Sequence, residues 1–138
     1  MKGVNFWSFI FASQVGAYAM VVLDQEYAGW FGLFGLFPGL KDPAWFIHHQ
    51  IDGTIFAIPL IFFLWNKLPG PGIVKGLIYG VLWHIFYVIF SIIGALGGAE
   101  GFTEGFKNLT TISVQISLII LHLVWGGLTG LLYDLEKK

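Results

Sequence analysis

The sequence predicts an all-α integral membrane protein, a bundle of four transmembrane helices in a single domain. Hydrophobic residues make up 57% of the 138 residues and charged residues only 11%, whereas an ordinary soluble domain carries about 25% charged residues. Several apolar runs also exceed the ~18 residues that indicate a membrane-spanning helix. No predicted loop is long enough to fold by itself, so we expect one domain over residues 1–138.

The composition excludes several classes of function. There is no cysteine, which removes disulfides, thiolate metal sites, iron–sulfur clusters and cysteine nucleophiles together. The formal net charge of −1 argues against nucleic acid as a partner, because nucleic-acid binding needs a basic surface. The expected surroundings are the lipid bilayer and other membrane subunits.

The first predicted span covers residues 6–23, and Asp24 and Glu26 follow it. The sequence Ala17-Tyr18-Ala19 also resembles a signal-peptidase site, which would make this segment a cleaved leader. We expect it to be retained and count it as the first of the four helices.

Residues 28–40 (AGWFGLFGLFPGL) form an apolar segment that is too short to span a bilayer. Aromatic side chains prefer the level of the lipid headgroups, so we expect an interfacial segment on the outer surface. A re-entrant loop is the alternative, but such backbone must be enclosed by protein, and this chain has little protein to enclose it.

The other three spans are apolar runs bounded by capping and turn residues, and they cover residues 43–65, 73–97 and 109–133. Asp42 and Pro43 make a favourable helix start for the second span, and Pro59 is expected to kink it. Residues 66–72, rich in proline and glycine, predict a tight turn before the third span, and residues 98–108 connect the third span to the fourth.

Lysines predict the orientation, because cytoplasmic loops of membrane proteins carry an excess of basic residues. Five lysines fall on one side of the predicted spans and two, Lys41 and Lys107, on the other. The five are Lys2, Lys67, Lys75, Lys137 and Lys138. We therefore expect both termini and residues 66–72 in the cytoplasm.

The third and fourth spans contain a mirrored motif. Gly76, Gly80 and His84 recur every four residues up the third span, and His122, Gly126 and Gly130 recur in the opposite order down the fourth. Consecutive spans run antiparallel, so reversed order in the sequence becomes matched depth in the membrane. At 1.5 Å per residue each histidine lies about 16 Å from the cytoplasmic boundary, near the middle of the bilayer.

The mirrored motif allows a structural interpretation and a haem interpretation. In the structural one, histidines and aspartate make interhelical hydrogen bonds and the glycines permit close packing. In the haem one, His84 and His122 are the two axial ligands of a b-type haem, and Gly80 and Gly126 leave room for the macrocycle. His48 or His49 could substitute as a ligand. The glycines face either a cofactor or each other.

A metal or proton site is the third interpretation. An ionised aspartate in mid-membrane costs ~2.5–3.5 kcal/mol even on the lenient insertion scale, so it should point into the bundle. Nitrogen and oxygen ligands for zinc, iron or copper are available from His48, His49, Asp52, His84 and His122. Asp52 with one or two of these histidines could also relay protons.

Short motifs between residues 44 and 133 resemble those of small four-span prokaryotic membrane proteins of unassigned function. These motifs are His49 with Gly53, Pro69 to Gly72, Lys75 with Gly76 and Gly80, and His122 with Gly126 and Gly130. The size and the polar layer are also similar to those of small membrane subunits of respiratory oxidases, by architecture alone.

These resemblances imply a multi-pass protein of a prokaryotic plasma (inner) membrane and a small membrane subunit of a respiratory or related electron-transfer complex. In one version, which rests on the mirrored motif, it carries a b-type haem between His84 and His122. We expect no catalytic activity from the chain alone. The first alternative is a cofactor-free assembly subunit, and the second is a proton- or metal-handling membrane protein.

Overall fold

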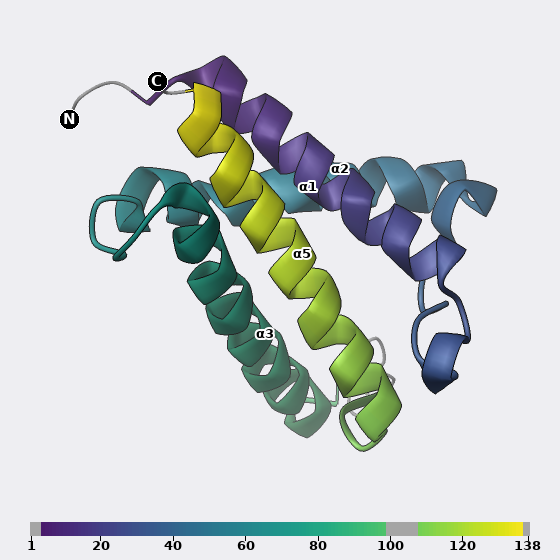
Figure 1. The fold of residues 1–138 in the computed structure, drawn as a ribbon. Helices are drawn as coiled ribbons and strands as arrows, with labels where there is room; N and C mark the ends of the chain where they lie inside the picture. Colours follow the sequence, from purple (N-terminus) through teal and green to yellow (C-terminus); the bar gives the residue numbers. More distant parts are fainter. Residues whose placement is uncertain (1–3, 99–107, 137–138) are drawn as a thin grey trace.

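A computed structural model describes residues 4–98 and 108–136, in which four long helices dominate (Figure 1). They are α1 (Phe6–Glu26), α2 (Pro43–Ile58), α3 (Gly72–Leu96) and α5 (Ile112–Glu136). Each is long and apolar enough to cross a membrane, when α2 is counted with the π-helical turn that continues it to Leu64. The predicted all-α architecture is confirmed, with four helices that are long and apolar enough to span a membrane.

The second span begins and breaks where its sequence predicts. The Asp42 side chain accepts a hydrogen bond from the Trp45 N–H at 3.0 Å, and Pro43 occupies the first turn. At Pro59 the α-helical pattern gives way to a π-helical turn, Pro59–Leu64. A proline lacks the N–H that the helix interior needs, so the hydrogen-bond ladder changes register at this residue.

Helix α5 lies between α1 and α3, and glycines let it approach α3 closely (Figure 1). A Cβ atom at Gly80 would lie 2.5 Å from the His122 carbonyl oxygen, and Gly76 and Gly72 contact the backbones of Gly126 and Gly130. Small residues that bring helix backbones together are the usual means of association in a membrane. The glycines of the two helices therefore face each other.

The other face of α5 packs on α1 in the same way. A Cβ atom at Gly16 would lie 2.8 Å from the Trp125 carbonyl oxygen, and Thr129 is fully buried beside it. Helix α2 packs mainly on α1, where a Cβ atom at Gly53 would lie 2.6 Å from that of Ala17. As a result α2 and α3 are joined only locally, and a space remains between them.

Asp24 anchors the segment between α1 and α2. The helix runs three residues past its predicted end at residue 23, and the Asp24 side chain is fully buried. Its carboxylate accepts hydrogen bonds from the N–H groups of Leu36 (3.0 Å) and Phe37 (2.8 Å). The Phe34 N–H donates to the Ser117 hydroxyl of α5 at 2.9 Å. We call residues 27–41 the strap, because these bonds fix it across the ends of α1 and α5.

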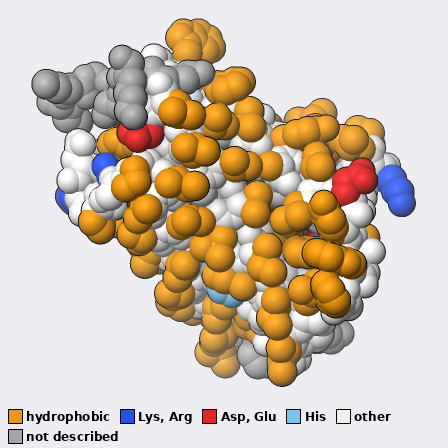
Figure 2. Space-filling view, viewed as in Figure 1, with side chains coloured by type: hydrophobic (Ala, Val, Ile, Leu, Met, Phe, Trp, Pro, Cys, Tyr) orange, Lys and Arg blue, Asp and Glu red, His pale blue; other side chains and the backbone are white. Residues whose placement is uncertain are grey.

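The surface matches a protein surrounded by lipid. Figure 2 shows hydrophobic side chains over the middle of one face and charged side chains near its two ends. The start of α1 and the end of α5 lie at the same end of the bundle (Figure 1). Four of the lysines behind the orientation prediction lie outside the described residues: Lys2, Lys107, Lys137 and Lys138. So does most of the connection over residues 98–108.

Candidate functional site

His84 of α3 and His122 of α5 meet in the middle of the bundle. Their Nδ1 atoms lie 3.2 Å apart and their ring centroids 5.3 Å apart. His122 is buried, and His84 is half-buried. Such a contact needs one nitrogen to donate and the other to accept, so at least one ring is a neutral imidazole. The mirrored spacing predicts this shared depth.

The space around His84 and His122 is too narrow for a haem between α3 and α5. Gly80 and Gly126 contact the opposite helix instead of open space; a Cβ atom at Gly126 would lie 3.1 Å from the Gly80 nitrogen. The two axial nitrogens of a haem lie on opposite sides of the iron and about 4 Å apart, twice a metal–nitrogen bond of ~2.0–2.1 Å, whereas the two Nδ1 atoms here are 3.2 Å apart. The haem assignment of His84, His122, Gly80 and Gly126 stays a prediction that requires the two helices to separate.

The remaining predicted ligands lie on α2. His48 Nδ1 is 3.6 Å from Asp52 Oδ2, and its side chain is 75% exposed. His49 points elsewhere and stacks on Trp45, with ring centroids 4.8 Å apart. Within residues 4–98 and 108–136, no three His, Asp or Glu side chains come close enough to hold one metal ion. The metal assignment also stays a prediction. The predicted ligands do not form one cluster, since His84 contacts His122 and His48 lies near Asp52.

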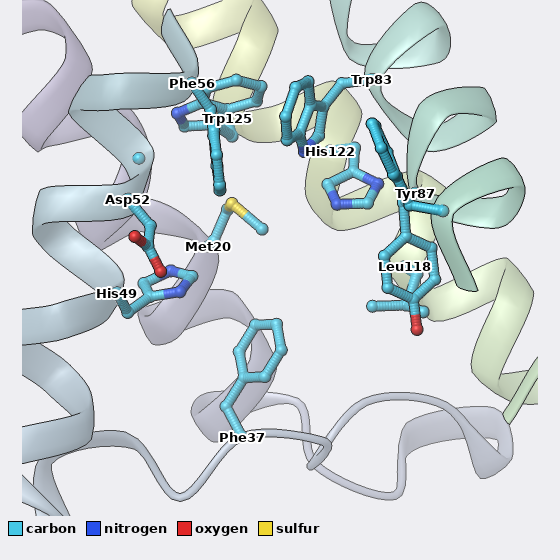
Figure 3. A pocket seen from close by; sticks show the side chains of 12 residues that line it. Met20, Phe37, His49, Asp52, Phe56, Trp83, Tyr87, Leu118, His122 and Trp125 are labelled. Carbon is cyan, nitrogen blue, oxygen red and sulfur yellow. The ribbon is translucent and has the colours of Figure 1, made fainter. Parts of the chain in front are cut away.

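A pocket of about 420 Å³ occupies the space between α2, α3 and α5 (Figure 3). This volume lies in the range of small-molecule sites, roughly 300–1,000 Å³. Its walls are mostly apolar and aromatic. They are formed by His49, Asp52, Gly53 and Phe56 of α2, by Trp83, Tyr87 and Phe90 of α3, by Leu118, His122 and Trp125 of α5, and by Met20 and Phe37.

Aromatic contacts close one end of the pocket and the strap closes the other. Phe56 stacks on Trp83 with centroids 4.4 Å apart, and the Tyr79 hydroxyl donates to the Phe56 carbonyl at 2.5 Å, which ties α3 to α2. At the opposite end Phe37 enters from the strap (Figure 3). Asp24, which holds the Phe37 backbone, therefore also positions this aromatic wall.

The polar groups of the pocket lie on two sides. His122 faces it from α5, and His49 and Asp52 face it from α2 (Figure 3). The Trp125 indole Nε1 is buried beside Gly53 and has no hydrogen-bond partner among the described residues. A buried, unpaired donor costs free energy, so the Trp125 Nε1 group is an unsatisfied polar site in an otherwise largely apolar wall.

The pocket was not predicted from the sequence, although part of its signal is present. Trp83, Tyr87 and Phe90 stand at i, i+4 and i+7, which places them on one face of α3. The same spacing fits a face turned to lipid or to another subunit. Comparison of the chain with family models, curated proteins and solved structures finds no match.

Proposed function

We propose that this four-span protein is a small membrane subunit that holds a flat lipophilic molecule in the pocket between α2, α3 and α5. The pocket carries the proposal: a cavity of about 420 Å³ with aromatic walls and a few polar side chains. A largely apolar cavity with few convergent polar groups is the usual form of a small-molecule site.

The position of the pocket supports a ligand that dissolves in the bilayer. Its walls come from α2, α3 and α5, all three long and apolar enough to span a membrane. Phe56 and Trp83 stack across the space between α2 and α3, and flat rings pack well against such faces. A lipophilic molecule would reach this site without crossing water.

We propose a respiratory or related electron-transfer complex as the setting, since such complexes exchange lipophilic carriers within the bilayer. A cofactor-free assembly subunit is the second candidate. It is favoured by the contact of His84 with His122 and by the glycines that join α3 to α5, because these account for the mirrored motif without a ligand.

Binding of a tritiated alkylbenzene tests the proposal. The protein in phosphatidylcholine nanodiscs should retain more of this probe than empty nanodiscs do. Leu118→Phe, which adds volume to the α5 wall of the pocket, should weaken retention severalfold. Leu135→Phe, a matched change at an exposed position outside the pocket, should not. Equal retention by protein-loaded and empty nanodiscs would favour the assembly subunit.

We also propose that both termini and residues 66–72 face the cytoplasm of a prokaryotic cell. The natural absence of cysteine makes single-cysteine labelling simple. Lys67→Cys should react with a membrane-impermeant maleimide only after the plasma membrane is opened, and Lys41→Cys should react in intact spheroplasts. The reverse pattern would invert the topology.

A further inference from the structure

The two nitrogens of the His122 ring face different surroundings. Nδ1 contacts His84 Nδ1 at 3.2 Å, and the Nε2 side of the ring faces the pocket (Figure 3). No hydrogen-bond partner occupies Nε2 among the residues that the structure describes. One ring therefore belongs both to the helix–helix contact and to the pocket wall.

This arrangement links the hydrogen-bonding character of the pocket to His84. A neutral imidazole carries one donor and one acceptor nitrogen. When His84 donates to His122, the pocket-facing Nε2 must carry the proton and donates. When His122 donates to His84, Nε2 becomes an acceptor. Moving a proton along the Nδ1–Nδ1 contact, with matching changes at the outer nitrogens, switches the pocket from donor to acceptor.

We infer that the pocket takes a quinone-type molecule: a flat, uncharged ring that carries an oxygen able to be a carbonyl or a hydroxyl. The inference rests on the proposed function and names the ligand class of the same site. A carbonyl oxygen accepts from the protonated Nε2, and a hydroxyl donates to the unprotonated one, so His122 can bind either form.

The opposite wall of the pocket strengthens this assignment. His49 and Asp52 of α2 lie across the cavity from His122 (Figure 3), which suits a ring with oxygens at opposite positions. Phe56 and Trp83, stacked on each other, line the cavity with aromatic carbon beside the ring. A pure hydrocarbon such as a lipid acyl chain would leave the buried His49 Nε2 without a hydrogen-bond partner, which is unfavourable.

The experiment compares two tritiated probes in nanodiscs, an alkylbenzoquinone and an alkylbenzene with the same tail. The wild-type protein should bind the quinone about tenfold more tightly, the effect of roughly one good hydrogen bond. His122→Phe should lose most of this preference, which is measured as the ratio of quinone to alkylbenzene affinity within the same variant.

Each outcome separates this inference from the proposed function. If the wild-type protein binds both probes equally, the quinone assignment is overturned and lipophilic binding stands. If neither probe binds, the proposed function fails as well. Because His122→Phe could disturb folding, the infrared carbonyl stretch of carbon-13-labelled quinone on the wild-type protein is a second measurement. It should fall relative to quinone in empty nanodiscs, and an unshifted band would overturn the inference.

Discussion

His84 and His122 are joined by a contact of 3.2 Å between their Nδ1 atoms, across the interface of α3 and α5. At the same interface, a Cβ atom added at Gly80 would overlap the His122 carbonyl oxygen, which would lie only 2.5 Å away. One consequence is rigidity, since backbone contact leaves little freedom for the two helices to slide. Another is that His122 is held in a fixed orientation toward the pocket.

This geometry predicts that the purified protein carries no haem with His84 and His122 as its two axial ligands. The two nitrogens contact each other directly and the neighbouring glycines are covered by backbone, so no space remains for a macrocycle between α3 and α5. Oxidised and dithionite-reduced visible spectra, with elemental analysis, measure this. A Soret band with reduced α and β bands that disappears in both His84→Ala and His122→Ala would restore the haem assignment.

A methyl group at the α3–α5 interface should be destabilising. Gly76→Ala would drive a Cβ atom into the Gly126 backbone, and backbone cannot yield as a side chain does. We expect a loss of roughly 1–3 kcal/mol in the free energy of unfolding, the usual cost of overpacking, measured by denaturant titration in mixed micelles.

Gly97→Ala is the control for this change. A Cβ atom there would lie 3.4 Å from the Ile93 carbonyl oxygen, an ordinary contact distance, so stability should change little. Equal losses in the two variants would show that the α3–α5 interface does not set the cost, because alanine is otherwise favoured over glycine in a helix.

Spacing alone predicts the histidine pair and its glycines. A period of four residues puts Gly76, Gly80 and His84 on one face of a helix, and antiparallel neighbours turn the reversed order of the fourth span into matched depth. The cap at Asp42 and the break at Pro59 are equally local, because each depends on the chemistry of one residue and its next turn. Such features need no knowledge of the tertiary structure.

The strap and the pocket depend on relationships that no local pattern contains. The strap turns at Phe31 (φ 52°) and Phe34 (φ 62°), and a left-handed backbone is uncommon for a residue other than glycine. Its anchor, Asp24, has the same sequence signature as an acid that ends a helix. Similarly, the aromatic face of α3 becomes a pocket wall only because α2 packs on α1 and leaves a space beside it.

Removing the Asp24 carboxylate should loosen the strap. Asp24→Asn replaces one acceptor oxygen with an amide that cannot accept, so one of the hydrogen bonds from Leu36 and Phe37 is lost. A hydrogen bond to a charged group contributes about 1.5–3 kcal/mol. Amide hydrogen exchange at Leu36 and Phe37 should therefore accelerate by a factor of about ten or more.

The neighbouring acid provides the matched comparison for the strap. Glu26 is exposed at the last turn of α1, so Glu26→Gln removes a carboxylate without touching the strap bonds. Exchange at Leu36 and Phe37 should stay at the wild-type rate. If both variants accelerate it equally, the effect comes from the charge at this end of the helix and not from the buried anchor.

The Tyr79 hydroxyl should control how fast a ligand leaves the pocket. It donates to the Phe56 carbonyl at 2.5 Å and so ties α3 to α2 beside the Phe56–Trp83 stack. Tyr79→Phe keeps the ring and loses this bond, at a cost of about 0.5–1.5 kcal/mol in the free energy of unfolding. With the tie gone, α2 and α3 can part more easily, and a bound alkylbenzene should dissociate severalfold faster in a nanodisc exchange assay. Tyr18→Phe makes the same chemical change at an exposed position of α1 and should alter neither stability nor dissociation. A Tyr79→Phe protein that loses stability but releases the probe at the wild-type rate would place the ligand's exit elsewhere, past Phe37 and the strap.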